Sequence, residues 1–156
     1  MNMEEMLLQI AMAVIGSLGF AIFFNTRGKK LALIAIGSAL STLVYLLVLY
    51  RTQDRVVSTL GGALVSAAIA DIMARMMKTP VIILLVPIVI PLVPGGDLYY
   101  SMRYFIIGNA EEFSTSFQFM LKEASAIAGG MILVSFIVQL ILKSKRYFKE
   151  IRHDKI

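Results

Sequence analysis

The sequence predicts an all-α integral membrane protein of about five transmembrane helices, with the N-terminus outside and the C-terminus inside. Of its 156 residues, 58% are hydrophobic and 16% are charged, whereas a soluble domain is usually about 45–50% apolar and about 25% charged. The apolar residues form five blocks, and most basic residues lie between blocks on one predicted side. A chain of this length has room for these spans and for no separate soluble domain.

Each apolar block ends at a short charged segment, which gives its approximate bounds. The predicted spans are residues 6–24, 31–50, 56–74, 80–94 and 124–142, followed by a basic tail at 143–156. The whole chain, 1–156, is expected to be one transmembrane domain. Glu4 and Glu5 stand where a signal peptide would carry Lys or Arg, so we interpret the N-terminal block as the first span.

The distribution of Lys and Arg gives the orientation. With the N-terminus outside, eleven of them fall inside and four fall outside, as the positive-inside rule requires. The four outside are Arg51, Arg55, Arg103 and Lys122. The fourth block is short for a span, and the other interpretation is a re-entrant segment that leaves four crossings.

The fourth block is distinguished by its prolines. The sequence TPVIILLVPIVIPLVPGGDLYY, residues 79–100, contains all four in the chain, and steps of seven, four and three residues place Pro80, Pro87, Pro91 and Pro94 on one helix side. A proline frees a carbonyl one turn earlier, and an unsatisfied backbone group is costly in lipid. We therefore expect this segment inside a bundle or against water, either as a kinked packing helix or as an interrupted transport helix.

The four residues PGGD, 94–97, end this block. Gly95 and Gly96 allow positive φ and close backbone approach, and Asp97 is suited to capping the next helix. The sequence leaves two interpretations open. One is a turn with a good N-cap, and the other is a broken element whose freed amides and carbonyls contact a substrate.

Asp71 is an acidic residue well inside an apolar block, and Arg75 follows one helical turn later. An ionisable group at that position is a functional candidate. The two side chains can also pair along one helix face, so a structural pair and a proton or substrate role both remain open.

The candidate substrate path combines the break of the fourth span with charged and polar residues at its two ends. Its residues are Asp71, Arg75, Lys78, Pro87, Pro91, Pro94, Gly95, Gly96, Asp97, Tyr99 and Arg103. The first three would guard the inner end and the last three the outer end. Arg103 would attract either a substrate carboxylate or a lipid phosphate.

Small and polar residues predict how the spans pack. Small residues let helices approach closely, and hydroxyls bond between helices. The third block has two adjacent rows of small residues at intervals of four, namely Ser58, Gly62, Ser66 and Ala70 beside Ala63 and Ala67. The fifth block has a similar surface at Ala126, Gly129 and Gly130. The second block has a polar row of Ser38, Thr42 and Tyr45.

Other classes of protein are disfavoured. The chain has no Cys and one His, His153 in the tail, and it contains no nucleophile elbow, zinc-binding HExxH or phosphate loop. We predict no enzyme activity, no cofactor and no metal. The positive charges lie between apolar blocks and in the tail, so we expect a membrane-surface role for the tail and no nucleic-acid binding.

The run ARMMKTPVIILLVPIVIPLVPGGDLYYSMRYFIIGN, residues 74–109, with ASAIAGGMILV at 124–134, resembles the threonine/serine exporter family, in its smaller, purely transmembrane half. The residues that carry over are Lys78, Thr79, Pro80, Pro91, Pro94, Gly95, Gly96, Leu98 and Tyr99. The resemblance implies an exporter of the bacterial inner membrane, energised by an ion gradient. It also implies threonine, serine or, for some split pairs, succinate as substrate.

The resemblance further implies a larger partner subunit with a soluble N-terminal region, which this sequence lacks, so we do not expect the chain to act alone. The combined prediction is a membrane subunit of a secondary export transporter for small polar metabolites. Membrane lipids and further copies of the chain are the other partners considered. The alternative is a non-transporting accessory subunit that stabilises a partner transporter.

Overall fold

The computed structural model describes residues 3–153, with side chains to residue 144, and within this range every regular element is a helix. In chain order these are α1 (Met3–Phe23), α2 (Lys29–Thr52), α3 (Arg55–Met76), α4 (Val81–Val89), the 3-10 helix η1 (Ile90–Leu92), α5 (Gly95–Ile106) and α6 (Ala110–His153). Four helices are long and apolar enough to cross a membrane, and the bent pair of α4–η1 with α5 is a fifth candidate. The prediction of an all-α, multi-pass membrane protein is confirmed.

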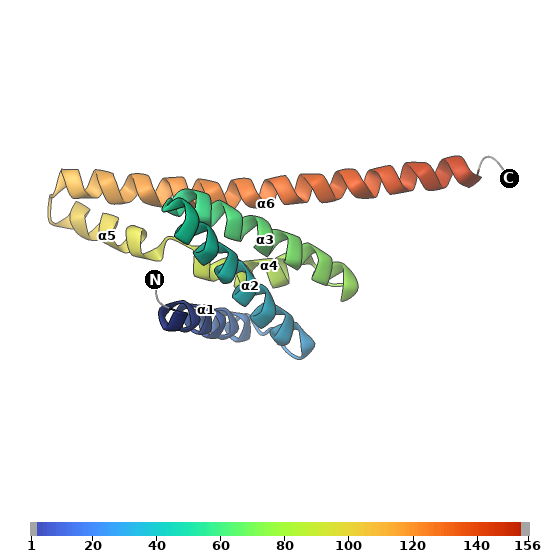
Figure 1. Ribbon diagram of the computed structural model, residues 1–156, viewed down its shortest axis with the longest axis horizontal. Helices are drawn as coiled ribbons and strands as arrows, with labels where there is room; N and C mark the ends of the chain where they lie inside the picture. The colour runs from blue at the N-terminus through green and yellow to red at the C-terminus, as the bar shows by residue number, and fades with distance from the viewer. Residues whose placement is uncertain (1–2, 154–156) are drawn as a thin grey trace.

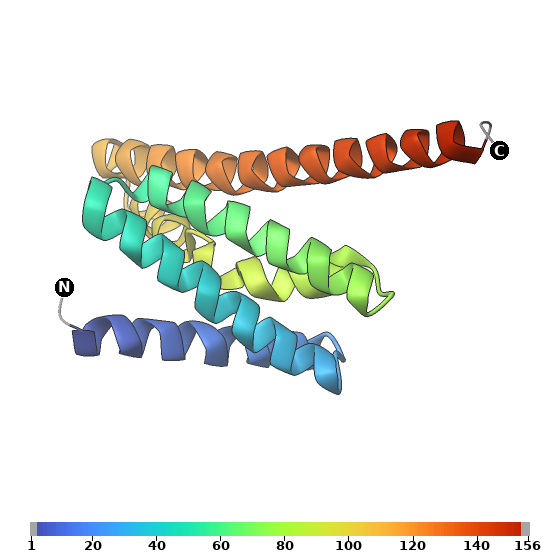
Figure 2. The ribbon, with the colours of Figure 1, turned by 45° about the vertical axis from the view of Figure 1, so that its right-hand side comes forward.

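The first four helices form a bundle, and α6 lies along one side of α3 and extends well beyond it (Figure 1). The α1–α2 and α3–α4 turns lie at one end of the bundle, toward which the end of α6 also points (Figure 2). The start of α1 and the α2–α3 turn lie at the other end. The basic segments of the two turns therefore lie at the same end, as alternating crossings require.

The α2–α3 turn is short because its residues close one helix and cap the next. Gln53 adopts the left-handed conformation, with φ of 56°, and its amide donates to the Leu49 carbonyl at 2.9 Å. The Asp54 carboxylate then accepts from the amides of Val56 and Val57 at 2.8 and 3.2 Å, an N-cap for α3. As a result α2 and α3 are antiparallel neighbours.

The predicted rows of small residues on α3 are buried as expected. Their members are Ser58, Gly62, Ala63, Ser66, Ala67 and Ala70. Gly130 of α6 packs against this surface so closely that a Cβ added there would lie 2.9 Å from Ala63 Cβ and 3.2 Å from the Leu64 amide nitrogen. Gly129, which the sequence placed in the same contact surface, faces open space instead.

Helix α6 is one continuous helix of 44 residues, which at 1.5 Å per residue is about 66 Å long. The hydrocarbon core of a bilayer is about 30 Å thick, so α6 extends past it. On α6, large apolar side chains such as Ile132 and Phe136 are exposed. The predicted membrane-surface role of the tail depends on side chains from residue 145 onward, which lie outside the described residues.

Candidate functional site

The proline segment lies inside the bundle, between α1, α2 and α3. Leu84 and Ile88 are fully buried on α4, and Leu92 of η1 is buried as well. Two glycines make room for these side chains. A Cβ on Gly37 would lie 2.6 Å from the Ile88 Cδ1, and one on Gly62 would lie 3.0 Å from both Leu92 methyl groups. The helix is therefore packed against protein along most of one face.

The segment runs the length of α3. At one end the Thr79 amide donates to the Ala74 carbonyl at 3.0 Å, just before Pro80 begins α4. At the other end Asp97 pairs with Arg55, the first residue of α3. Since α3 has 22 residues, the segment covers about 33 Å of helix axis, which is comparable to the thickness of a bilayer core.

The prolines occupy four different environments. Pro80 precedes α4, Pro87 is buried within it, Pro91 lies in η1, and Pro94 precedes α5. The helix tightens to the 3-10 form after Val89 and then turns by 61° into α5. These bends occur where prolines remove the amides that a continuous α-helix requires.

Gly95 and Gly96 form the first turn of α5, and neither has a positive φ. A Cβ at either position would meet nothing within 4 Å. The expectation of positive φ is therefore wrong for these two residues, and close approach of a substrate to their backbone stays a prediction. The capping expectation is also wrong, because α5 begins at Gly95 and the Asp97 side chain bonds to another helix rather than to its own amides.

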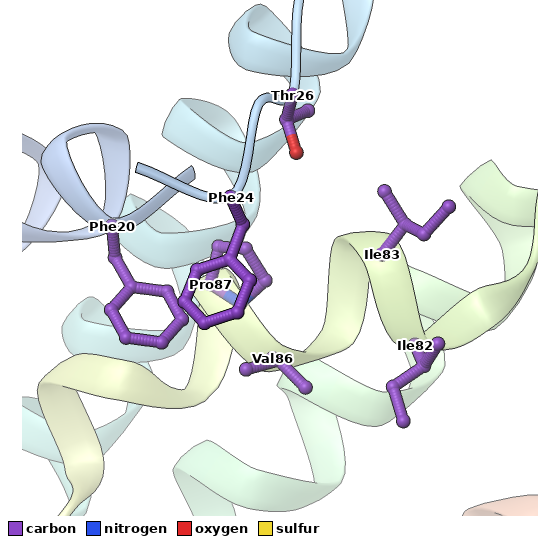
Figure 3. Close-up of a pocket in the computed structure, with 7 residues that line it drawn as sticks. All are labelled: Phe20, Phe24, Thr26, Ile82, Ile83, Val86 and Pro87. Atoms are coloured by element: carbon purple, nitrogen blue, oxygen red, sulfur yellow. The ribbon is translucent and has the colours of Figure 1, made fainter. Parts of the chain in front are cut away.

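A mainly apolar cavity of about 240 Å³ lies between the end of α1 and the first turns of α4. Figure 3 shows the rings of Phe20 and Phe24 on one side and Ile82, Ile83 and Val86 on the other. Of the predicted path residues, Pro87 lines it, and the Thr26 hydroxyl is the polar group that the figure shows. No charged group lines this cavity, so it suits a hydrocarbon group better than a polar metabolite.

Three helices bring charges together at the other end of the proline segment. Arg55 begins α3, Asp97 lies in the first turn of α5, and Glu123 lies on α6. Arg55 Nη2 donates to Asp97 Oδ2 at 2.5 Å and lies 2.9 Å from Glu123 Oε1. We call these three residues the three-helix cluster.

The members of the three-helix cluster differ in exposure. The side chain of Arg55 is 46% exposed and that of Asp97 is 17% exposed, whereas Glu123 as a residue is 4% exposed. Glu123 Oε1 is buried and accepts no hydrogen bond of good geometry, although Arg55 is near. Tyr45 of α2 interacts electrostatically with all three, and the Arg55 guanidinium lies 5.8 Å from the Phe119 ring centroid.

The opposite end of α3 holds the pair that the sequence singled out. Arg75 donates from Nε to Asp71 Oδ2 at 2.6 Å and from Nη2 to Asp71 Oδ1 at 2.9 Å. Both residues lie on one helix, so we call them the same-helix pair. The geometry is that of the structural interpretation, in which each charge satisfies the other.

The remaining predicted residues do not join either group. Lys78 is exposed and has φ of 51°, where it closes the turn after α3. Tyr99 is 64% exposed and packs edge-on against Tyr100. Arg103 is exposed in the last turn of α5. The structure thus brings together Asp71 with Arg75 and links Asp97 to residues outside the predicted set.

Sequence reasoning did not place Arg55, Glu123 or Tyr45 in the candidate substrate path, although it named Tyr45 in the polar row of the second span. A signal was present, since Arg55 directly precedes the third apolar block and Glu123 directly precedes the fifth. Both positions border predicted spans on the same predicted side as Asp97. Opposite charges at the borders of spans on one side could therefore have been considered as a cluster.

Polar residues continue between α2 and α3. The hydroxyls of Ser41 and Ser66 lie 2.5 Å apart, and they lie 3.0 and 2.9 Å from the Gly62 carbonyl oxygen. Of the predicted row on α2, Ser38 bonds within its own helix, and Thr42 Oγ1 is buried without a hydrogen-bond partner. The bond between helices is made by Ser41, a residue the predicted row did not include.

Within the described part of the chain, no group of three or more His, Cys, Asp or Glu side chains is arranged to hold a metal ion. A family model described as Threonine/Serine exporter, ThrE, matches residues 9–137. This range contains the proline segment, the three-helix cluster and the same-helix pair. No curated protein and no solved structure matches the chain.

Proposed function

The chain belongs to the threonine/serine exporter family, and we propose that it is a membrane subunit of a secondary exporter for small polar metabolites. Its substrates would be amino acids of the threonine and serine type, with dicarboxylates such as succinate as the other candidates. It would act with a larger subunit that has a soluble N-terminal region, in the inner membrane of a bacterium. The N-terminus would face outward and the tail inward.

The observation that carries this proposal is the position of the proline segment. It is buried among α1, α2 and α3, runs the length of α3, and ends in a 61° bend beside the three-helix cluster. Broken helices in transporters place freed backbone groups near a substrate at the interface of structural units. The bend here leaves Gly95 and Gly96 exposed and uncrowded, which is the condition for contact with a substrate or a partner.

The exposed members of the three-helix cluster favour an amino acid. Arg55 and Asp97 carry opposite charges and both reach the surface, so they could meet the carboxylate and the ammonium of a zwitterion. A dicarboxylate would find one cation there. Its export would require further positive charge, which Arg103 or the partner subunit would have to supply.

Large exposed apolar surfaces support a partner within the membrane. Side chains such as Ile132, Phe136 and Ile141 of α6 are each at least half exposed. In a membrane, lipid or another helix covers such a surface. A larger transmembrane subunit packed there would complete the structure around α6.

Export from cells tests the proposal. Gly95→Leu and Gly96→Leu should abolish threonine export while the protein stays in the membrane, because a Cβ at either position meets no atom of this chain within 4 Å and the new side chain occupies the exposed bend. Gly16→Leu is the matched control, since Gly16 on α1 is equally uncrowded and lies far from the bend in sequence. Normal export by both bend variants would count against a transport role for this element.

Reconstitution separates a transporting subunit from an accessory one. Proteoliposomes would hold this chain alone, the larger chain alone, and the two together. We expect threonine movement only with both chains. Transport at the full rate by the larger chain alone would make this chain an accessory subunit that stabilises its partner.

A further inference from the structure

Glu123 is an acidic side chain that the transport path predicted from the sequence does not use. It lies on α6, is 4% exposed, and its Oε1 is buried without a hydrogen bond. Burying a carboxylate is costly unless it is fully paired. Ionisable residues in this situation inside membrane proteins often mark proton pathways, so the partners of Glu123 decide what it does.

The charges around Glu123 do not balance. Arg55 from α3 is shared between two carboxylates, because its Nη2 serves both Asp97 Oδ2 and Glu123 Oε1. Asp97 from α5 adds a second negative charge, and Tyr45 from α2 has a phenol, which carries no charge at neutral pH. With both carboxylates ionised, the three-helix cluster has a formal charge of −1. One added proton would make it neutral.

The proton has one preferred position. Asp97 has the hydrogen bond from Arg55 and a more exposed side chain, whereas Glu123 has neither. A residue that is 4% exposed offers almost no surface to a ligand larger than a proton. The partly exposed edge formed by Arg55 and Asp97 gives water a route to the cluster.

We propose that Glu123 is the carboxyl group that binds and releases the coupling proton of this exporter, an inference that rests on the proposed function. Binding forms an O–H bond on the carboxylate and makes Glu123 neutral. Arg55 is then left with Asp97 as its single charged partner. Because Asp97 lies in the first turn after the bend, the change acts directly on the orientation of α5 relative to η1. Release of the proton restores the sharing of Arg55.

The test uses the complete exporter, this chain with its partner, in proteoliposomes. Two activities are measured, namely net threonine movement driven by a pH gradient, and exchange of labelled for unlabelled threonine without a gradient. Glu123→Gln fixes the neutral form, so it should lose gradient-driven movement and keep exchange. Glu112→Gln is the control on the same helix, because Glu112 is exposed, and it should keep both activities.

Three results would overturn the proposal. The first is gradient-driven movement that persists in Glu123→Gln. The second uses Glu123→Asp, which retains a titratable group and should therefore retain coupling. If Glu123→Gln and Glu123→Asp both lose both activities, Glu123 has a packing role instead. The third is a Glu123→Gln variant that stays coupled to the gradient but needs a higher threonine concentration than the wild type for half-maximal exchange. That result would make Glu123 a substrate ligand.

An infrared titration distinguishes failure of this inference from failure of the proposed function. The purified complex should show a carboxylic-acid carbonyl band that changes with pH, and Glu123→Gln should remove it. If the wild-type complex moves no threonine, the proposed function fails, and the band still decides whether Glu123 takes up a proton. Absence of that difference between wild type and variant would overturn the assignment.

Discussion

The two ends of α3 carry charged groups that are built differently. At the end of the helix, Asp71 and Arg75 are one turn apart, and both bonds stay within α3. At its start, Arg55 meets Asp97 of α5 and Glu123 of α6. The same-helix pair would persist if α3 were isolated, whereas the three-helix cluster exists only when three helices are correctly placed.

The difference shows where charge and conformation can be coupled. A pair within one helix satisfies its charges in any arrangement of the bundle, so a change in its ionisation has little effect on the positions of other helices. A cluster shared by three helices changes its energy whenever one of them moves. We therefore propose a functional role for the three-helix cluster and a local structural role for the same-helix pair.

The largest effect is expected from separating α3 and α6 without touching a charge. In Gly130→Leu, even the first added carbon would lie 2.9 Å from Ala63 Cβ, so the helices must move apart. Overpacking a tight contact usually costs about 1–3 kcal/mol, and a full leucine side chain should exceed the upper value. The melting temperature in detergent should fall steeply, and export should be lost with it.

Gly129→Leu is the neighbouring control, because nothing lies within 4 Å of a Cβ at that position. It should leave the melting temperature close to that of the wild type. Equal destabilisation by both substitutions would show that the loss comes from glycine replacement in α6 rather than from the α3–α6 contact.

The second-largest loss of stability is expected from removing the positive charge of Arg55, which Asp97 and Glu123 share. Arg55→Gln leaves Glu123 buried beside Asp97 with no positive charge between them. Leaving a buried charged group without its partner costs about 1–3 kcal/mol or more, and the half-exposed side chain of Arg55 places this case toward the lower value. The loss should appear as a lower melting temperature above neutral pH.

Protonation should reverse that loss. As pH falls, Glu123 can become neutral, so Arg55→Gln should approach the stability of the wild type under acidic conditions. The measurement is the melting temperature of both proteins as a function of pH. A difference between them that does not change with pH would show that Arg55 contributes packing rather than charge.

The sequence was sufficient for the features that depend on local spacing. The helical class, the small-residue surface of α3 and the pairing of Asp71 with Arg75 all follow from intervals of about four residues or from composition. It was insufficient where distant segments meet. Arg55 and Asp97 are 42 residues apart, and no local pattern indicates that the turn before α3 lies beside the bend after η1.

The glycines show the same limit. Gly95 and Gly96 attracted interest because they follow proline, yet they are uncrowded. Gly37 drew no interest, and it is the position where an added Cβ would lie closest to another side chain, Ile88. A glycine's role in close packing depends on the side chain opposite it, which is known only once the helices are placed.

A smaller effect is expected between the two ends of α3, where Ser41 joins α2 to α3. Ser41→Ala removes a hydroxyl that lies within hydrogen-bond distance of the Ser66 hydroxyl and the Gly62 carbonyl. Hydrogen bonds between membrane helices contribute about 0.6 kcal/mol on average. Ser66 keeps its own bond to Gly62, so a drop of a few degrees at most in melting temperature is expected. A drop as large as that of Gly130→Leu would contradict this minor role.

The smallest effect is expected at the same-helix pair. Asp71→Asn makes the same carboxylate-to-amide change as Glu123→Gln, but Arg75 is exposed and can turn to water or lipid headgroups once its partner is neutral. We expect no measurable change in melting temperature and normal threonine export. Because Asp71 is also a candidate path residue, the two measurements answer different questions. Normal stability with lost export would give Asp71 a direct part in transport and would place functional charges at both ends of α3. Normal stability with normal export would confine the transport role to the three-helix cluster.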